Sequence, residues 1–176
     1  MTTLVIGDAA SGKSAYAERI LCKQSGDLPR FYIATMQPFG EEAERRIARH
    51  RDMRREKNFN TIECYVNLSG ADVTQNSALL LEDIGNLCAN ELFSPSGSGE
   101  NAAEAILHGI ERLQARCQTL VIVSNEVFCG GTDYAGETMR YLSILSYVNR
   151  KIAALADNVC EVCCGIASYY KGREPR

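Results

Sequence analysis

The sequence lacks several features that would place it in a large class of proteins. It has no basic excess, because 22 acidic and 19 basic residues give a net charge of −3, which argues against a general nucleic-acid-binding protein. It has no apolar run near membrane-spanning length, no signal-peptide pattern and no internal repeat. With 176 residues, of which 45% are apolar, we expect residues 1–176 to form a single domain with one sizeable core.

The eight cysteines lack the spacing of a metal site. Their only local cluster is the segment Cys160-Glu161-Val162-Cys163-Cys164. No second Cys-x-x-Cys or Cys/His pair completes a zinc site. We therefore expect free, buried thiols in the core of a reduced, cytoplasmic protein.

What the sequence does contain is a complete phosphate-binding motif, Gly-x-x-x-x-Gly-Lys-Ser. Its residues are Gly7, Asp8, Ala9, Ala10, Ser11, Gly12, Lys13 and Ser14. The two glycines allow backbone amides to point at phosphate oxygens, and a following helix adds its positive N-terminus. Lys13 brings a full charge to the β- and γ-phosphates, and the Ser14 hydroxyl can bind Mg²⁺. The motif predicts a nucleoside triphosphate as ligand.

Short apolar runs alternate with helical patterns along the chain. We expect strands at residues 4–6, 31–35, 61–65, 78–81, 120–124 and 158–164, and helices at 14–21, 40–57, 84–93, 101–116 and 141–156. From residue 165 onward we expect a tail. The alternation predicts an α/β fold with a mostly parallel sheet covered by helices on both faces. In such sheets, ligands bind beyond the carboxyl ends of the strands.

Polar residues stand at two of these strand ends. Glu82 and Asp83 follow residues 78–81, and Asn125 and Glu126 follow residues 120–124. A phosphate loop needs a partner that holds Mg²⁺ or orients a nucleophile, and this is usually an acid after an apolar strand. Glu82 is the first candidate and Asp83 the second, whereas Asn125 and Glu126 are suggested by position alone. The alternative is that these acids are simply the polar start of a loop.

His50 lies in the basic half of the expected helix at 40–57. The spacing places Arg46, His50 and Arg54 on one helix face, where flanking cations disfavour the imidazolium and the arginines could clamp a phosphate. A neutral imidazole in this setting is what attack on a nucleotide α-phosphate requires. The alternatives are a solvated basic helix or an arginine lid that closes over a nucleotide. His108 lacks such neighbours, so we expect it to be structural.

Segments along nearly the whole chain match one known family. They are the phosphate loop, Tyr32-Ile33-Ala34-Thr35, Arg46-Ile47-Ala48-Arg49-His50-Arg51 with Arg54, Thr61-Ile62-Glu63, Leu80-Leu81-Glu82, Asn125-Glu126-Val127, Asn149 with Ala153, and Gly165-Ile166. With these segments the chain resembles the bifunctional adenosylcobinamide kinase/adenosylcobinamide-phosphate guanylyltransferases of cobalamin biosynthesis. The His50 segment together with Asn-Glu-Val is far more specific than the phosphate loop alone.

The resemblance implies a three-layer, RecA-like P-loop NTPase fold and a trimeric assembly. It implies that ATP or GTP phosphorylates adenosylcobinamide, and that GMP then passes from GTP through His50 to adenosylcobinamide phosphate. Lys13 would share catalysis with His50. Nucleotide contacts would also come from Thr35, Arg51, Arg54, Glu63 and Glu82, and Mg²⁺ would be held by Ser14 and Glu82.

Some positions depart from the family pattern and bear on corrinoid binding and subunit contacts. Asp83 stands where relatives commonly have cysteine, Phe128 follows Asn-Glu-Val in place of glycine, and Leu142, Ser143 and Ser146 replace an Arg-Asp and a Gly.

Two other functions are considered. One is a different small-molecule kinase in which His50 takes no part in catalysis, and the other is a nucleotide-sensing regulator. The regulator is disfavoured because the Asn-Lys-x-Asp guanine signature is absent.

Overall fold

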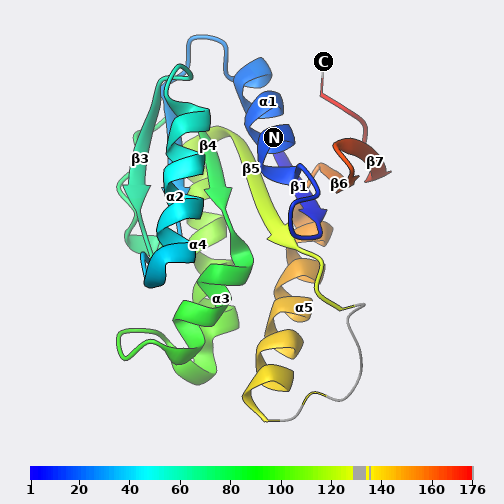
Figure 1. Cartoon of the computed structure of the whole chain (residues 1–176). Coiled ribbons are helices and arrows are strands. Elements are labelled where there is room, and N and C mark those ends of the chain that lie inside the picture. The colour runs from blue at the N-terminus through cyan, green and yellow to red at the C-terminus, as the bar shows by residue number, and fades with distance from the viewer. Residues whose placement is uncertain (129–133, 135, 176) are drawn as a thin grey trace.

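The computed structural model describes residues 1–128, 134 and 136–175 (Figure 1). Along the chain the elements are β1 (Thr2–Gly7), α1 (Lys13–Ser25), β2 (Arg30–Ala34), α2 (Gly40–Arg54), β3 (Phe59–Glu63), a 3-10 turn η1 (Leu68–Gly70), β4 (Ser77–Glu82), α3 (Ile84–Phe93), a second 3-10 turn η2 (Gly99–Asn101), α4 (Ala102–Arg116), β5 (Cys117–Asn125), α5 (Glu137–Leu155), β6 (Asn158–Cys163) and β7 (Ile166–Lys171).

The described strands form one sheet in the order β3-β2-β4-β5-β1-β6-β7. Neighbours from β3 to β6 pair in parallel, and β7 alone pairs antiparallel, with β6. β1 lies between β5 and β6, so the loop that leaves its carboxyl end stands beside the ends of two parallel strands. The predicted α/β fold with a mostly parallel sheet is confirmed.

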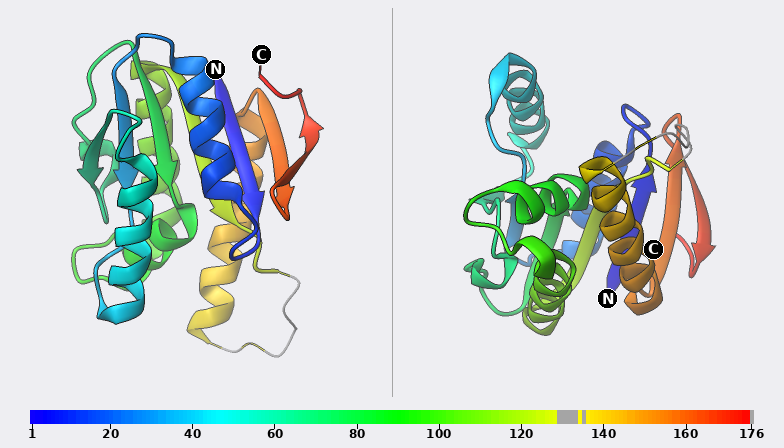
Figure 2. Two further views of the ribbon diagram at one scale, coloured as in Figure 1. Left: turned by 45° about the horizontal axis from the view of Figure 1, so that its top comes forward. Right: turned by 90° about the horizontal axis from the view of Figure 1, so that it is seen from below.

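Each face of the sheet has its own apolar core, because alternate strand residues point to opposite sides. Val5 and Leu80 pack with Ile20 of α1 on one face. Leu4 and Leu79 pack on the other face, together with residues of α3, α4 and α5. Figure 2 shows this second layer covering one face, while α1 covers the other. The helices therefore cover both faces of the sheet and give three layers, helix, sheet and helix, as the sequence predicts.

Helix α2 lies on the α1 side but stands apart from the body of the sheet (Figure 2, right). Among those of its side chains that the structure describes, Arg54 alone is buried, with 7% of its surface exposed. Its sequence is acidic in the first turn and basic in the last turn, which suits the helix dipole. The helix is thus anchored mainly near its C-terminal end.

Three predictions about the C-terminal third are wrong. Residues after 165 form β7 instead of a tail, and α5 begins at Glu137 rather than at residue 141. The turn between β6 and β7 also leaves Cys163 and Cys164 exposed, although Cys160 is buried as expected. Cys129 lies outside the described residues. Within the described part of the chain, every helix is too short or too polar to cross a lipid bilayer.

Candidate nucleotide-binding site

The phosphate loop connects the end of β1 to the start of α1. Gly12 has a φ of 92°, which a side chain would disfavour. A Cβ on Gly7 would lie 2.6 Å from the Val162 carbonyl oxygen of β6, so this position also needs glycine. Inside the loop, the Ser11 N–H donates to the Asp8 carbonyl oxygen at 3.2 Å.

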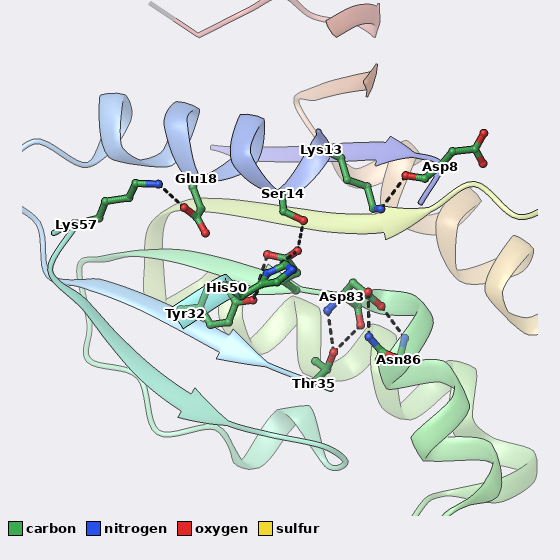
Figure 3. A network of polar contacts seen from close by, with 11 residues as sticks. Asp8, Lys13, Ser14, Glu18, Tyr32, Thr35, His50, Lys57, Asp83 and Asn86 are labelled. Carbon is green, nitrogen blue, oxygen red and sulfur yellow. Dashed lines mark hydrogen bonds and ion pairs between the residues drawn. The ribbon is translucent and has the colours of Figure 1, made fainter. Parts of the chain in front are cut away.

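Lys13 is held at the mouth of this loop. Its Nζ donates to the Asp8 carbonyl oxygen at 3.1 Å (Figure 3), and the residue is only 7% exposed. Burial lowers the pKa of the Lys13 ammonium, while the carboxylates of Asp83 and Glu82 oppose that shift. A buried cation that is short of solvent is well suited to an anionic ligand.

Glu82 contacts three residues that are labelled in Figure 3, namely Ser14, Tyr32 and His50. Its Oε1 accepts a hydrogen bond from the Ser14 hydroxyl and lies 3.5 Å from Nδ1 of His50. Its Oε2 accepts from the Tyr32 hydroxyl at 3.1 Å. Burial alone would raise the pKa of Glu82, but the hydrogen bond and charge of His50, followed by Ser14 and Tyr32, lower it.

His50 therefore has an acidic neighbour as well as basic ones. The sequence places only arginines near it, whereas the structure adds the Glu82 carboxylate and the Tyr32 hydroxyl, which is 3.5 Å from Nδ1. The carboxylate and the phenol are neighbours that the spacing of the arginines does not reveal. The His50 side chain is 21% exposed, and it lines the same cavity as the phosphate loop.

Arg54 stacks on the ring of Tyr32, with its guanidinium carbon 3.3 Å from the ring centroid. This cation–π contact joins the last turn of α2 to β2, the strand next to the β3 edge of the sheet. Burial, and then the charge of Glu82, raise the pKa of Tyr32 well above its usual value, so its hydroxyl stays protonated and donates. One guanidinium nitrogen of Arg54, Nη1, is buried without a hydrogen-bond partner among the residues that the structure describes.

A buried ion pair next to Arg54 has no signature in the sequence. Glu18 of α1 is fully buried and pairs with Lys57, which follows α2. Burial raises the pKa of Glu18, and Lys57 opposes the shift. The second oxygen of Glu18, Oε1, has no hydrogen-bond partner within the described part of the chain. The pair connects the phosphate-loop helix to the segment that leads from α2 into β3.

Asp83 and Thr35 have structural roles that the sequence does not reveal. The Asp83 side chain caps α3 by accepting from the Asn86 N–H at 2.6 Å and also accepts from Asn125. The Thr35 hydroxyl is buried and donates to the Asp83 carbonyl oxygen at 2.8 Å. These contacts fix the strand ends that border the loop.

The remaining predicted residues lie at different distances from this centre. Arg51 pairs with Glu63 at 3.0 Å on the exposed side of β3. Arg46 is exposed and lines the cavity. The Glu126 side chain accepts a hydrogen bond from the Phe128 N–H at 3.1 Å, so it caps the turn in which it lies.

A single cavity of about 700 Å³ connects most of the predicted residues. Those that line it are Ala9, Ala10, Ser11, Gly12, Lys13, Ser14, Arg46, His50, Arg51, Arg54, Glu63, Glu82, Asp83 and Asn125. The described residues hold no group of three or more His, Cys, Asp or Glu side chains that could bind a metal ion. A cation here would take most of its ligands from phosphate oxygens and water, as Mg²⁺ does beside nucleotides.

A phosphate loop between a central parallel strand and a helix, with an acid on the next strand but one, defines a P-loop nucleotide-binding protein of the α/β class. The fold agrees with the ATPase domain of G40P, with a TM-score of 0.50 at 11% identity over 91% of this chain and 68% of that chain.

The chain belongs to the cobinamide kinase/cobinamide phosphate guanyltransferase family, whose pattern matches residues 3–169. It is 37% identical to the bifunctional adenosylcobalamin biosynthesis protein CobU of Salmonella typhimurium, over 94% of this chain and 97% of that protein. It is 34% identical to CobU of Escherichia coli, with the same coverage. It is 31% identical to CobP of Pseudomonas aeruginosa, over 98% of both chains. The predicted family resemblance is confirmed.

Proposed function

We propose that the chain phosphorylates the aminopropanol hydroxyl of adenosylcobinamide with ATP or GTP, and then transfers GMP from GTP to the product. The transfer passes through a guanylyl group on His50 and gives adenosylcobinamide-GDP. Family membership supports the two activities. The observation that carries the histidine step is that Oε1 of Glu82 contacts both the Ser14 hydroxyl and His50 Nδ1. The candidate nucleophile and the triphosphate cradle therefore share one carboxylate.

In the kinase step, the loop amides and Lys13 bind the β- and γ-phosphates. Lys13 stabilises the charge that develops as the γ-phosphoryl group leaves. Its partial burial strengthens this interaction, because little water competes for the ammonium. The acceptor hydroxyl oxygen attacks the γ-phosphorus and gives up its proton to water. The bond between the γ-phosphorus and the β–γ bridging oxygen breaks, and the nucleoside diphosphate leaves.

Ser14 and Glu82 offer one hydroxyl and one carboxylate side by side, and both are hard oxygen donors suited to Mg²⁺. We infer that these two residues hold Mg²⁺ when a nucleotide is bound. The ion would supply charge neutralisation between the phosphates. The hydrogen bond to this carboxylate keeps the Ser14 hydroxyl oriented toward Glu82.

In the guanylyl step, Nδ1 of His50 faces Glu82, which leaves Nε2 as the attacking atom. A carboxylate at Nδ1 keeps the proton there and so keeps a lone pair on Nε2. The Nε2–phosphorus bond forms at the α-phosphate, and pyrophosphate leaves. A phosphate oxygen of adenosylcobinamide phosphate then breaks the nitrogen–phosphorus bond and restores His50. Arg46, Arg51 and Arg54 surround this path and can bind the pyrophosphate.

We further propose that residues 1–176 act as one nucleotide-binding domain in a cytoplasmic homotrimer. The seven described cysteines are all free thiols, which suits a reducing compartment. Light scattering of the purified protein measures the oligomeric state, and a monomer would contradict this part of the proposal.

The decisive experiment follows the α-phosphate of GTP. The protein is incubated with α-labelled GTP, denatured, and assayed for an acid-labile label. We expect the label on the wild type and on His108→Ala, whose exposed histidine lies on α4. We expect no label on His50→Ala. A parallel reaction with γ-labelled ATP and adenosylcobinamide measures the kinase step on its own.

Two results would overturn the histidine step. One is an unlabelled wild-type protein that still binds GTP, and the other is equal labelling of His50→Ala. Transfer of the γ-phosphoryl group to an acceptor, without any α-phosphate label on the protein, would favour the alternative kinase in which the arginine-rich helix is a lid. Nucleotide binding without either transfer would favour the regulator.

A further inference from the structure

The turn between β6 and β7 carries two adjacent thiols on the surface. Cys163 ends β6, Ile166 begins β7, and these two residues are paired across the turn. Cys164 and Gly165 between them have φ values of 51° and 80°, as a two-residue hairpin turn with right-handed strand twist requires. Both cysteines are exposed. The protein uses neither thiol in the nucleotide site described above.

The sulfur atoms of Cys163 and Cys164 lie 3.9 Å apart. A disulfide between them is disfavoured, because neighbouring Cα atoms are about 3.8 Å apart while disulfides usually need about 4.4–6.8 Å. A bridging atom avoids this conflict. With bonds of about 2.3 Å, the length of a zinc–thiolate bond, it can bind both sulfurs, because the gap is less than twice the bond length.

The chemistry of the surroundings limits which bridging atom fits. Structural zinc needs four protein ligands, and in residues 1–128, 134 and 136–175 no third or fourth His, Cys, Asp or Glu joins the pair as a metal-binding group. A trivalent organoarsenic centre needs only two sulfurs, because its third bond is to its own carbon. Arsenic is a soft, thiophilic element that favours thiolate ligands, like the soft metals.

The turn is in direct contact with the phosphate loop. The Gly165 N–H donates to the Ser11 carbonyl oxygen at 2.8 Å. A Cβ on Gly12 would lie 3.2 Å from the Gly165 Cα, so the two backbones are closely packed. A bridge across Cys163 and Cys164 restrains the residue next to Gly165, and through it the carbonyl of the loop.

We propose that Cys163 and Cys164 form a binding site for trivalent arsenicals, and that its occupation weakens nucleotide binding at the phosphate loop. The reaction with phenylarsine oxide forms two arsenic–sulfur bonds. The arsenic-bound oxygen leaves as one water molecule with both thiol protons, and neither arsenic nor sulfur changes its oxidation state. The predicted effect on nucleotide binding rests on the proposed function, because it requires that the phosphate loop binds a nucleotide.

The experiment treats the full chain with phenylarsine oxide and measures two quantities. Intact-protein mass spectrometry gives the number of arsenicals bound, and fluorescence anisotropy of a labelled GTP gives the nucleotide affinity. We expect one arsenical per chain. We also expect nucleotide binding about five- to tenfold weaker, because the ring closed across Cys163 and Cys164 displaces Gly165 and the phosphate loop loses the Gly165–Ser11 hydrogen bond. A dithiol such as dimercaptopropanol should reverse both changes, whereas a monothiol should not.

Matched variants locate the site. Cys163→Ser and Cys164→Ser should bind nucleotide normally and keep their affinity after treatment, whereas Cys22→Ser, which removes a lone thiol of α1, should remain sensitive. Sensitivity that persists in both turn variants, or arsenic bound to the pair with unchanged affinity, would overturn the proposal. Failure of the untreated protein to bind nucleotide would instead contradict the proposed function, while the mass measurement still tests the thiol site.

Discussion

Replacing Lys57 with methionine tests whether the buried Glu18–Lys57 pair fastens α2 to the phosphate-loop helix. Lys57→Met keeps the length of the side chain and removes its charge, so Glu18, which is fully buried, is left without its ion-pair partner. Breaking a buried pair in this way typically costs about 3–5 kcal/mol. The Lys57 side chain is 35% exposed, so solvent screens part of the interaction and we expect about 2 kcal/mol.

The effect should depend on pH, because burial already raises the pKa of Glu18 above its ordinary value of 4.5. Loss of Lys57 raises that pKa further, since the opposing charge is gone. A carboxyl with a raised folded-state pKa destabilises the fold at pH values above it, and this cost disappears as the group becomes protonated. The variant should therefore be strongly destabilised at pH 8 and much less so at pH 5.

Thermal unfolding at the two pH values measures this difference. For a chain of this size, about 2 kcal/mol corresponds to a lowering of the Tm by about 4–8 °C. The double variant Glu18→Gln/Lys57→Met should recover more than half of the loss, because it buries no unpaired charge. Lys23→Met changes an exposed lysine of α1 and serves as the control. Equal losses at both pH values, or a double variant no more stable than the single one, would refute the reasoning.

Three other changes test the loop, the core and a helix cap. Lys13→Ala should abolish detectable triphosphate binding in calorimetry and leave the circular dichroism spectrum unchanged, and normal affinity would contradict our account of the loop. Leu79→Ala removes a fully buried side chain and should lower the free energy of unfolding by about 2–5 kcal/mol; urea titration measures it, and a loss under about 1 kcal/mol would argue against tight packing there. Asp83→Ala removes the cap of α3 and should cost about 1 kcal/mol, whereas Asp83→Asn should cost less because an amide oxygen can still accept from the Asn86 N–H. If the two Asp83 variants unfold at the same urea concentration, the cap is not the source of the loss.

The phosphate loop and Glu82 could be predicted because a short, contiguous sequence pattern marks each of them. An apolar strand that ends in Gly-x-x-x-x-Gly-Lys-Ser, or in an acid, carries its own local signal. Tyr32, Glu18 and Lys57 have no such spacing. They come together because Tyr32 and α1 lie on the same face of the sheet, and that arrangement depends on the whole sheet.

The errors at the C-terminal end have similar causes. The first turns of α5 are exposed, so residues such as Met139 give no apolar periodicity to mark the start of the helix. β7 is an edge strand in which Ile166 and Tyr170 are largely exposed, and half-exposed edge strands lack the apolar run that predicts a central strand. The turn residues Cys164-Gly165 also lack the Asn-Gly or Asp-Gly pattern that predicts a hairpin. The two exposed thiols follow directly from this hairpin.

The position of β1 has a consequence for how the protein is made. Its partners β5 and β6 come late in the chain, and the Thr2 N–H bonds Asp157, 155 residues away. A nascent chain therefore carries the complete phosphate-loop sequence long before it has the strands that support it. Such distant pairing slows folding, and the nucleotide site is expected to be among the last parts to assemble. Nucleotides in the cell would then stabilise the finished fold and not its precursors.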